Sequence, residues 1–214
     1  MTDTAAVSRF RAGLPLDLTL VGQQVRLEPL SLLHAEELAA AAADGELWKL
    51  HYTVVPTAEQ MPAMVEDALQ NRDAGSEHPF VVRRLSDNRV VGTTRYYFIS
   101  EQDRNLSIGY TWYAASVHRT GINTECKLLL LQHAFEKLGC IAVHWHTHHE
   151  NTRSQTAIKR LGAKFDGVIR NHKIMPNGTI RHTHCFSMID SEWPQSKAFL
   201  MGRLSAFMDS DDAE

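Results

Sequence analysis

The chain has 214 residues, of which 43% are hydrophobic and 22% are charged, and its formal net charge is −3. This composition indicates one soluble globular domain, large enough to bury a core. The weakly acidic balance lacks the basic excess of a nucleic-acid or membrane-surface binder, so we expect neither partner. No run approaches the ~18 apolar residues of a membrane helix, and the N-terminus has no apolar leader segment.

The three cysteines, Cys126, Cys140 and Cys185, are odd in number and have no paired spacing. Cysteines used in this way suit a reducing compartment and buried apolar positions. We therefore expect a cytoplasmic protein of the bacterial type.

The first predicted elements are a strand over 18–27 and two helices. The first helix is expected over 31–43, with Ser31 as its N-cap and a stop at Asp44-Gly45. The second is expected to begin at Thr57, where Gln60 would complete a capping box, and to end near 71–75.

The later elements follow from alternating and helical spacing of apolar residues. In chain order they are strands over 79–85, 89–99 and 106–113, a helix within 126–139, a strand over 141–147, a helix over 151–161, strands over 164–175 and 179–189, and a helix from 193. We divide the chain into an N-terminal arm (1–17), a single domain (18–209) and an acidic tail (210–214). The order predicts an α+β fold, with a mainly antiparallel sheet and one parallel crossover.

The turn over 118–125 joins the strand that ends at Tyr113 to the helix that follows. A helix start aims unpaired N–H groups and the positive end of the helix dipole at one point, which favours an anion such as phosphate. Gly121 would let the ligand approach the backbone, and Arg119 adds a positive charge.

Histidines alternate on two predicted strands. His144, His146 and His148 share one face of the first strand, and His182 and His184 lie on the last long strand. Imidazoles close in space can bind zinc, but the chain has no Cys/His knuckle and no HExxH helix. We expect no metal, and we expect surface histidines or histidines that line a substrate channel.

The stretch 107–163 resembles the GNAT superfamily of acyl-CoA N-acyltransferases. It is similar to the branch that includes the ribosomal-protein alanine/serine N-acetyltransferases, and the resemblance extends over 18–205. The superfamily's phosphate loop, [Gln/Arg]-x-x-Gly-x-[Gly/Ala], falls on 118–123; Gly121 matches, whereas His118 and Asn123 depart from it. Asn151-x-x-Ser154, the helix end Leu161-Gly162-Ala163 and the segment 189–194 also resemble this branch.

The resemblance implies a six- to seven-stranded, mostly antiparallel sheet with a splayed parallel pair that binds acetyl-CoA as co-substrate. Pantetheine would pair with the strand edge, pyrophosphate would lie on the loop amides, and Asn151 would bind pantetheine, order a water or act as a plain N-cap. The implied cofactor-binding residues are Trp112, Tyr113, Ala114, His118, Arg119, Thr120, Gly121, Ile122, Asn123, Thr124 and Asn151.

For catalysis, the resemblance points to Ser154 as a hydrogen-bond donor to the leaving sulfur, with a capping serine as the alternative. The tyrosine that often serves this purpose in the family is replaced by Ile158. Glu28, Glu101 and several histidines remain open as the general base.

The function implied is direct acetyl transfer from acetyl-CoA to a primary amine, on a protein or peptide N-terminus or on a small molecule. Trp48, His51 and Tyr52 fall in the region that covers the acceptor site in this superfamily, and they are expected either to shape a pocket for the amine or to pack in the core. Homodimers are common in this superfamily. Two alternatives are a non-catalytic acyl-CoA-binding module and a histidine-based, metal-dependent hydrolase.

Overall fold

The computed structural model describes residue 10 and residues 12–211. Its strands are β1 (Leu20–Val21), β2 (Val25–Pro29), β3 (Glu77–Arg84), β4 (Val90–Ser100), β5 (Asn105–Tyr113), β6 (Ala142–His148), β7 (Lys164–Ile174) and β8 (Ile180–Ile189). Its helices are α2 (Ala35–Ala43), α3 (Met61–Asp73), α4 (Ile122–Gln132), α5 (Thr152–Arg160) and α6 (Trp193–Asp211). Short 3-10 turns span Leu32–His34, Leu47–Lys49, Ala115–Val117 and Asp190–Glu192, and a π-helical turn, His133–Leu138, extends α4.

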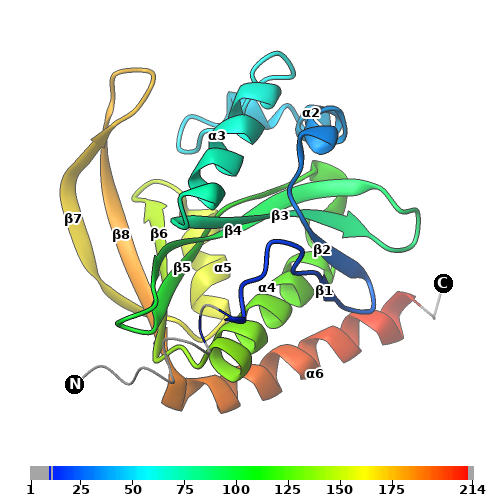
Figure 1. Ribbon diagram of the computed structural model, residues 1–214, viewed down its shortest axis with the longest axis vertical. Coiled ribbons are helices and arrows are strands. Elements are labelled where there is room, and N and C mark those ends of the chain that lie inside the picture. Colours follow the sequence, from blue (N-terminus) through cyan, green and yellow to red (C-terminus); the bar gives the residue numbers. More distant parts are fainter. Residues whose placement is uncertain (1–9, 11, 212–214) are drawn as a thin grey trace.

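The strands form one sheet in the order β1-β2-β3-β4-β5-β6-β8-β7. Every pair is antiparallel except β5 with β6, which confirms the predicted mixed fold with a single parallel pair. In Figure 1, α2 and α3 lie on one side of the sheet, and α4 and α6 lie on the other. No helix among the described residues is both long and apolar enough to span a bilayer.

The strand predicted over 18–27 is wrong as a single element, because the chain turns back on itself to form β1 and β2. The carboxylate of Glu125, at the start of α4, accepts the backbone N–H groups of Gln23, Gln24 and Val25 at 2.7, 2.8 and 2.9 Å. A Cβ on Gly22 would lie 2.5 Å from the carboxylate carbon, so only glycine leaves room for this contact. The hairpin raises the strand count to eight.

Both early helices begin later than predicted. The helix predicted over 31–43 starts with a 3-10 turn, in which His34 Nδ1 accepts the Ser31 N–H at 3.1 Å, and α2 begins at Ala35. Thr57 is not the N-cap of α3, which begins at Met61. The side chain of Gln60 still reaches back to the Thr57 N–H, at 3.2 Å, so half of the expected capping box forms in the preceding turn.

The core has two parts, one on each side of the sheet. The larger part lies between the sheet, α4, α5 and α6, and the smaller lies beneath α2 and α3. Phe10 is fully buried in the larger part, and the Gly13 carbonyl oxygen lies 3.0 Å from His133 Nε2. Residues 1–9 and 11 of the predicted arm, and 212–214 of the predicted tail, lie outside the described residues.

Replacing Glu125 with alanine tests how far the structure depends on this carboxylate. The change leaves three backbone N–H groups without their acceptor, one of them buried, so we expect the free energy of unfolding to fall by about 3 kcal/mol. Urea denaturation measures this change. As the matched control, Glu66→Ala on the exposed face of α3 should change stability by less than about 0.5 kcal/mol. Equal effects of the two variants would contradict the anchoring role.

Candidate functional site

The parallel strands β5 and β6 pair over only three positions: Asn105 with Ala142, Leu106 with Val143, and Ser107 with His144. Beyond Ser107, β5 continues to Tyr113 beside β4, while β6 stays paired with β8 up to His148. The two strands therefore part, and one edge of each faces an opening. Main-chain groups at such an edge can pair with an extended ligand.

The end of β5 presents its backbone to this opening. Ala114 donates its N–H to the Val91 carbonyl of β4 at 2.8 Å. Because the peptide between residues 113 and 114 is trans and planar, the Tyr113 carbonyl points the opposite way, away from β4. His118 Nε2 lies 2.9 Å from that carbonyl oxygen. Tyr113 therefore carries the carbonyl at the opening, and the Ala114 N–H is turned away from it.

The predicted anion loop leads directly into α4, with Gly121 as the N-cap. Thr120 Oγ1 accepts the Ile122 N–H at 3.4 Å. Within the part of the chain that the structure describes, no acceptor is assigned to the N–H groups of Asn123 and Thr124. Arg119 is exposed and has a left-handed backbone (φ 67°). This arrangement has the features of an anion site at a helix start.

Two loop residues interact with the protein itself in ways that the sequence did not indicate. A Cβ on Gly121 would lie 2.6 Å from the Gln24 amide, so the missing side chain makes room for Gln24 of the β1–β2 turn. Burial, followed by the guanidinium of Arg153, lowers the pKa of His118 below its ordinary value of 6.5. His118 is therefore neutral at pH 7 and donates from Nε2 to the Tyr113 carbonyl.

The start of α5 lies near this loop, since the charge of Arg153 acts on His118. Asn151 is its N-cap, and the side-chain oxygen accepts the Ser154 N–H at 2.9 Å. Ser154 is partly buried in the first turn, whereas Ile158 is buried in the core. The N-cap role of Asn151 is thus confirmed, and it leaves the Asn151 amide nitrogen and the Ser154 hydroxyl for other contacts.

A bulge in β5 lies near the opening, where the pairing with β4 shifts between Gly109 and Trp112. The buried Lys127 of α4 donates to Thr111 Oγ1 at 2.8 Å and to Thr94 Oγ1 at 3.2 Å. Burial lowers the pKa of Lys127 to about 8. The ammonium thus links α4 to both strands at the bulge.

The sheet face opposite α4 carries the predicted row of histidines, and we call it the histidine face. Tyr96 donates its hydroxyl to the Leu130 carbonyl of α4, so the next residue, Tyr97, points to the histidine face. A Cβ on Gly109 would lie 2.7 Å from the Tyr97 ring, which therefore crosses β5. Tyr97 Oη lies 2.9 Å from His146 Nδ1. This pair bridges β4 and β6 across β5, just beyond Ser107, which is the last residue of β5 that pairs with β6.

The predicted histidines do not converge on one metal site. His146 and His148 pair with Cys185 and Thr183 of β8, whereas His184 contacts the ring of Phe165. A smaller group is formed by His148, His149 and Glu150, whose ligand atoms lie within 4.8 Å of one another.

His51 and Tyr52 lie near the same end of β6. His51 Nε2 is 3.2 Å from Glu150 Oε2, which brings the loop after α2 to that strand. Tyr52 contacts the His51 ring edge-on, and Trp48 packs against the smaller core.

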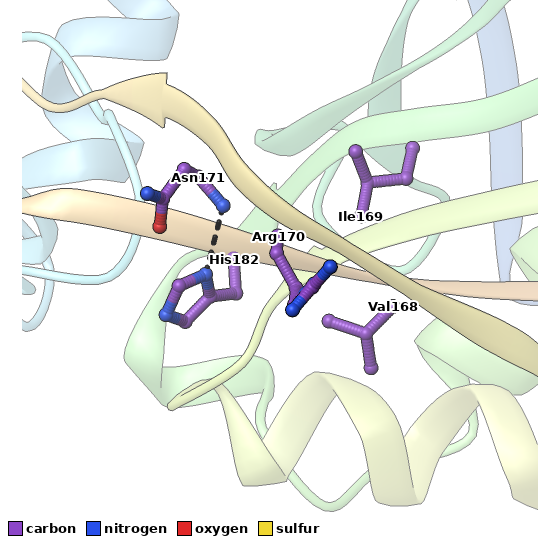
Figure 2. Close-up of a pocket in the computed structure, with 5 residues that line it drawn as sticks. All are labelled: Val168, Ile169, Arg170, Asn171 and His182. Atoms are coloured by element: carbon purple, nitrogen blue, oxygen red, sulfur yellow. Dashed lines mark hydrogen bonds between the residues drawn. The ribbon is translucent and has the colours of Figure 1, made fainter.

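A separate shallow hollow of about 660 Å³ lies on the β7–β8 hairpin, shown in Figure 2. It is lined by Val168, Ile169, Arg170, Asn171 and His182, and His182 Nδ1 accepts the Asn171 N–H at 2.9 Å. No residue of the predicted cofactor site lines this hollow.

Solved structures with the same fold include a GCN5-related N-acetyltransferase from Brucella melitensis, which is 29% identical. It has a TM-score of 0.79, and the match covers 89% of this chain and 87% of that chain. RimL, a ribosomal L7/L12 alpha-N-protein acetyltransferase, is 16% identical with a TM-score of 0.70, over 82% of this chain and 93% of that chain. The microcin C7 self-immunity acetyltransferase MccE, solved with acetyl-CoA and AMP, is 17% identical with a TM-score of 0.71, over 83% and 99%.

A search of curated protein sequences found no match. The family model described as an acetyltransferase (GNAT) domain, however, matches residues 24–164. That range contains the parting strands, the anion loop and α5. The predicted resemblance is confirmed: this chain belongs to the GNAT acetyltransferases and is an acyltransferase enzyme.

Proposed function

We propose that this enzyme transfers an acetyl group directly from acetyl-CoA to a primary amine, on a small molecule or a peptide. The observation that carries the proposal is the opening between β5 and β6, which lies next to the start of α4. The free strand edge could pair with the amides of the pantetheine arm of CoA, and the anion site that follows it could bind the phosphates.

The cofactor placement uses the predicted set of residues. Pyrophosphate would accept hydrogen bonds from the backbone N–H groups between Arg119 and Thr124, and the Arg119 side chain would be a further donor. Pantetheine would extend along Trp112, Tyr113 and Ala114, and Asn151 would bind it from α5. His118, being neutral, would hold the strand end in place instead of neutralising phosphate.

For proton transfer, we assign the role of general base to His146. Burial keeps the pKa of His146 below 6.5, so the imidazole is neutral at pH 7. Burial also raises the pKa of Tyr97 well above its ordinary value, so its hydroxyl stays protonated. With Nδ1–H donated to Tyr97 Oη, the lone pair of Nε2 is left to accept a proton. Tyr97 is then a positioning residue.

The chemical step balances as follows. His146 Nε2 accepts one proton from the substrate ammonium, and the free amine attacks the thioester carbonyl carbon. The C–N bond forms, the C–S bond breaks, and the second amine proton passes to the thiolate through the Ser154 hydroxyl. Products are the N-acetylated amine and CoA, and the first proton leaves from His146 to solvent.

Calorimetric titration with CoA tests the cofactor site. We expect micromolar affinity, and Arg119→Gln should weaken it about tenfold because one charge-assisted contact to phosphate is lost. Arg170→Gln, which removes an exposed arginine of the β7–β8 hairpin, should bind as the wild type does. Absence of binding at millimolar CoA would exclude the acetyl-CoA assignment.

Replacement of Ser154 with alanine tests the leaving-group contact. We expect kcat to fall at least about tenfold while the affinity for CoA is unchanged, because the hydroxyl acts only on the departing sulfur. A parallel loss of CoA affinity would mean that Ser154 serves binding instead. Wild-type protein that binds CoA but acetylates no amine would support the non-catalytic module.

Replacement of His146 with glutamine tests the general base. At pH 7 we expect kcat/KM to fall by about 100-fold relative to the wild type. This difference from the wild type should become smaller at high pH, because the amine then loses its proton without a base. The pH profile of kcat/KM measures both effects. His184→Gln, on the opposite face, should retain the wild-type profile. A deficit that stays constant with pH would indicate a structural role for His146.

A further inference from the structure

Arg181 of β8 is a partly buried cation. Its Nε donates to Thr183 Oγ1 at 2.9 Å. Among the described residues, no carboxylate oxygen lies within 4 Å of its guanidinium. Burial, the largest influence on this group, lowers the pKa of Arg181. A cation in this position has lost part of its hydration without gaining an ion pair.

Two other buried arginines of the sheet show how this chain usually satisfies such a group. Arg95 Nη1 lies 2.7 Å from Glu77 Oε2. Arg83 contacts both Glu28 and Glu37, each at 2.9 Å. Arg181 differs from both, because the groups that act on it are the hydroxyls of Thr183, Tyr97 and Tyr110 and the thiol of Cys185.

The position of Arg181 follows from the strand register. Cys185 and Thr183 lie opposite His146 and His148, and directly paired residues share a face of the sheet. Arg181 is two residues from Thr183 and therefore lies on the histidine face as well.

The electrostatic neighbours of Arg181 agree with this placement. Its charge acts on Tyr97 and Tyr110, and it contributes to the lowered pKa of His146. The guanidinium of Arg181 therefore lies on the same face as the Tyr97–His146 bridge, and its charge acts on both members of that bridge.

We propose that Arg181 is an anion-binding subsite for the acceptor, so that the acceptor is a primary amine that also carries a carboxylate or a phosphate. The planar guanidinium fork matches either oxyanion, and the partner would restore the missing ion pair. This inference rests on the proposed function, since the amine must reach the base at His146. The same positive charge disfavours a nearby ammonium, so it also promotes the neutral amine that attacks.

Matched acceptor pairs test the substrate class. The wild-type enzyme with acetyl-CoA is assayed on L-alanine against L-alaninamide, and on ethanolamine phosphate against ethanolamine. We expect the anionic member of at least one pair to have a kcat/KM about 10- to 100-fold higher. The pair that shows the preference distinguishes a carboxylate from a phosphate. Equal or higher rates with both neutral members would overturn the proposal.

Variants then assign the preference to Arg181. In Arg181→Gln the KM of the anionic acceptor should rise at least tenfold while that of the neutral acceptor stays the same, and Arg181→Lys should restore part of the loss. Arg170→Gln, on the same hairpin and exposed, should keep the wild-type preference. An equal loss on both acceptors in Arg181→Gln would show a structural role and contradict the subsite.

A binding measurement separates this inference from the proposed function. The wild-type protein is saturated with CoA, which fills the phosphate loop, and its thermal midpoint is followed as inorganic phosphate or acetate is added. At ten times the dissociation constant we expect a rise of about 3 °C, absent in Arg181→Gln and present in Arg170→Gln. A rise without any acetyl transfer would retain the subsite and reject the proposed function. A response identical in wild type and Arg181→Gln would reject the subsite whether or not amines are acetylated.

Discussion

The architecture of the site depends on where the pairing between β5 and β6 stops. After Ser107 and His144, β5 remains bound to β4 and β6 remains bound to β8, so each strand keeps one hydrogen-bonded neighbour and exposes its other edge. An unpaired edge inside a sheet has an energetic cost unless a ligand or side chains satisfy it. In this chain His118 occupies one end of the gap, and the Tyr97–His146 bridge crosses the other side.

The opening also relates the two faces of the sheet to each other. The start of α4 and the start of α5 approach it from one face, and the histidines approach it from the other. In the proposed function, the cofactor and the acceptor would therefore reach the same gap from opposite sides. This separation is consistent with the proposal, in which the anion-binding loop precedes α4 and the general base lies on β6.

Much of the fold could be predicted from local patterns. Alternation in β3 to β6 and helical spacing in α4 and α5 are short-range signals, and Gly139 and Gly162 end their helices with positive φ as expected. The residues from His118 to Gly121 were placed correctly before α4, and Asn151 and Ser154 at the start of α5, whereas Ile122, Asn123 and Thr124 of the predicted loop lie in the first turn of α4, which begins four residues earlier than predicted. What remained hidden depends on contacts between distant residues. Glu125 accepts hydrogen bonds from three N–H groups and so splits the first strand, and only the register of β8 places Arg181 on the same face as His146. Gly109 was the one feature of the local sequence that indicated that another side chain, here Tyr97, lies across β5.

The burial of Lys127 next to Cys126 has a consequence for how protons are linked to folding. The pKa of Lys127 falls to about 8, so the unfolded chain holds that proton more tightly and folding becomes more favourable as pH rises from about 8 towards 10.5. The pKa of Cys126 rises to about 12, so its contribution is complete below pH 9 and is lost above it. His78, with its pKa lowered to about 4, removes stability as pH falls below 6.5. Taken together, these three groups favour the folded state most between about pH 9 and 10.5, where the gain from Lys127 offsets the loss from Cys126.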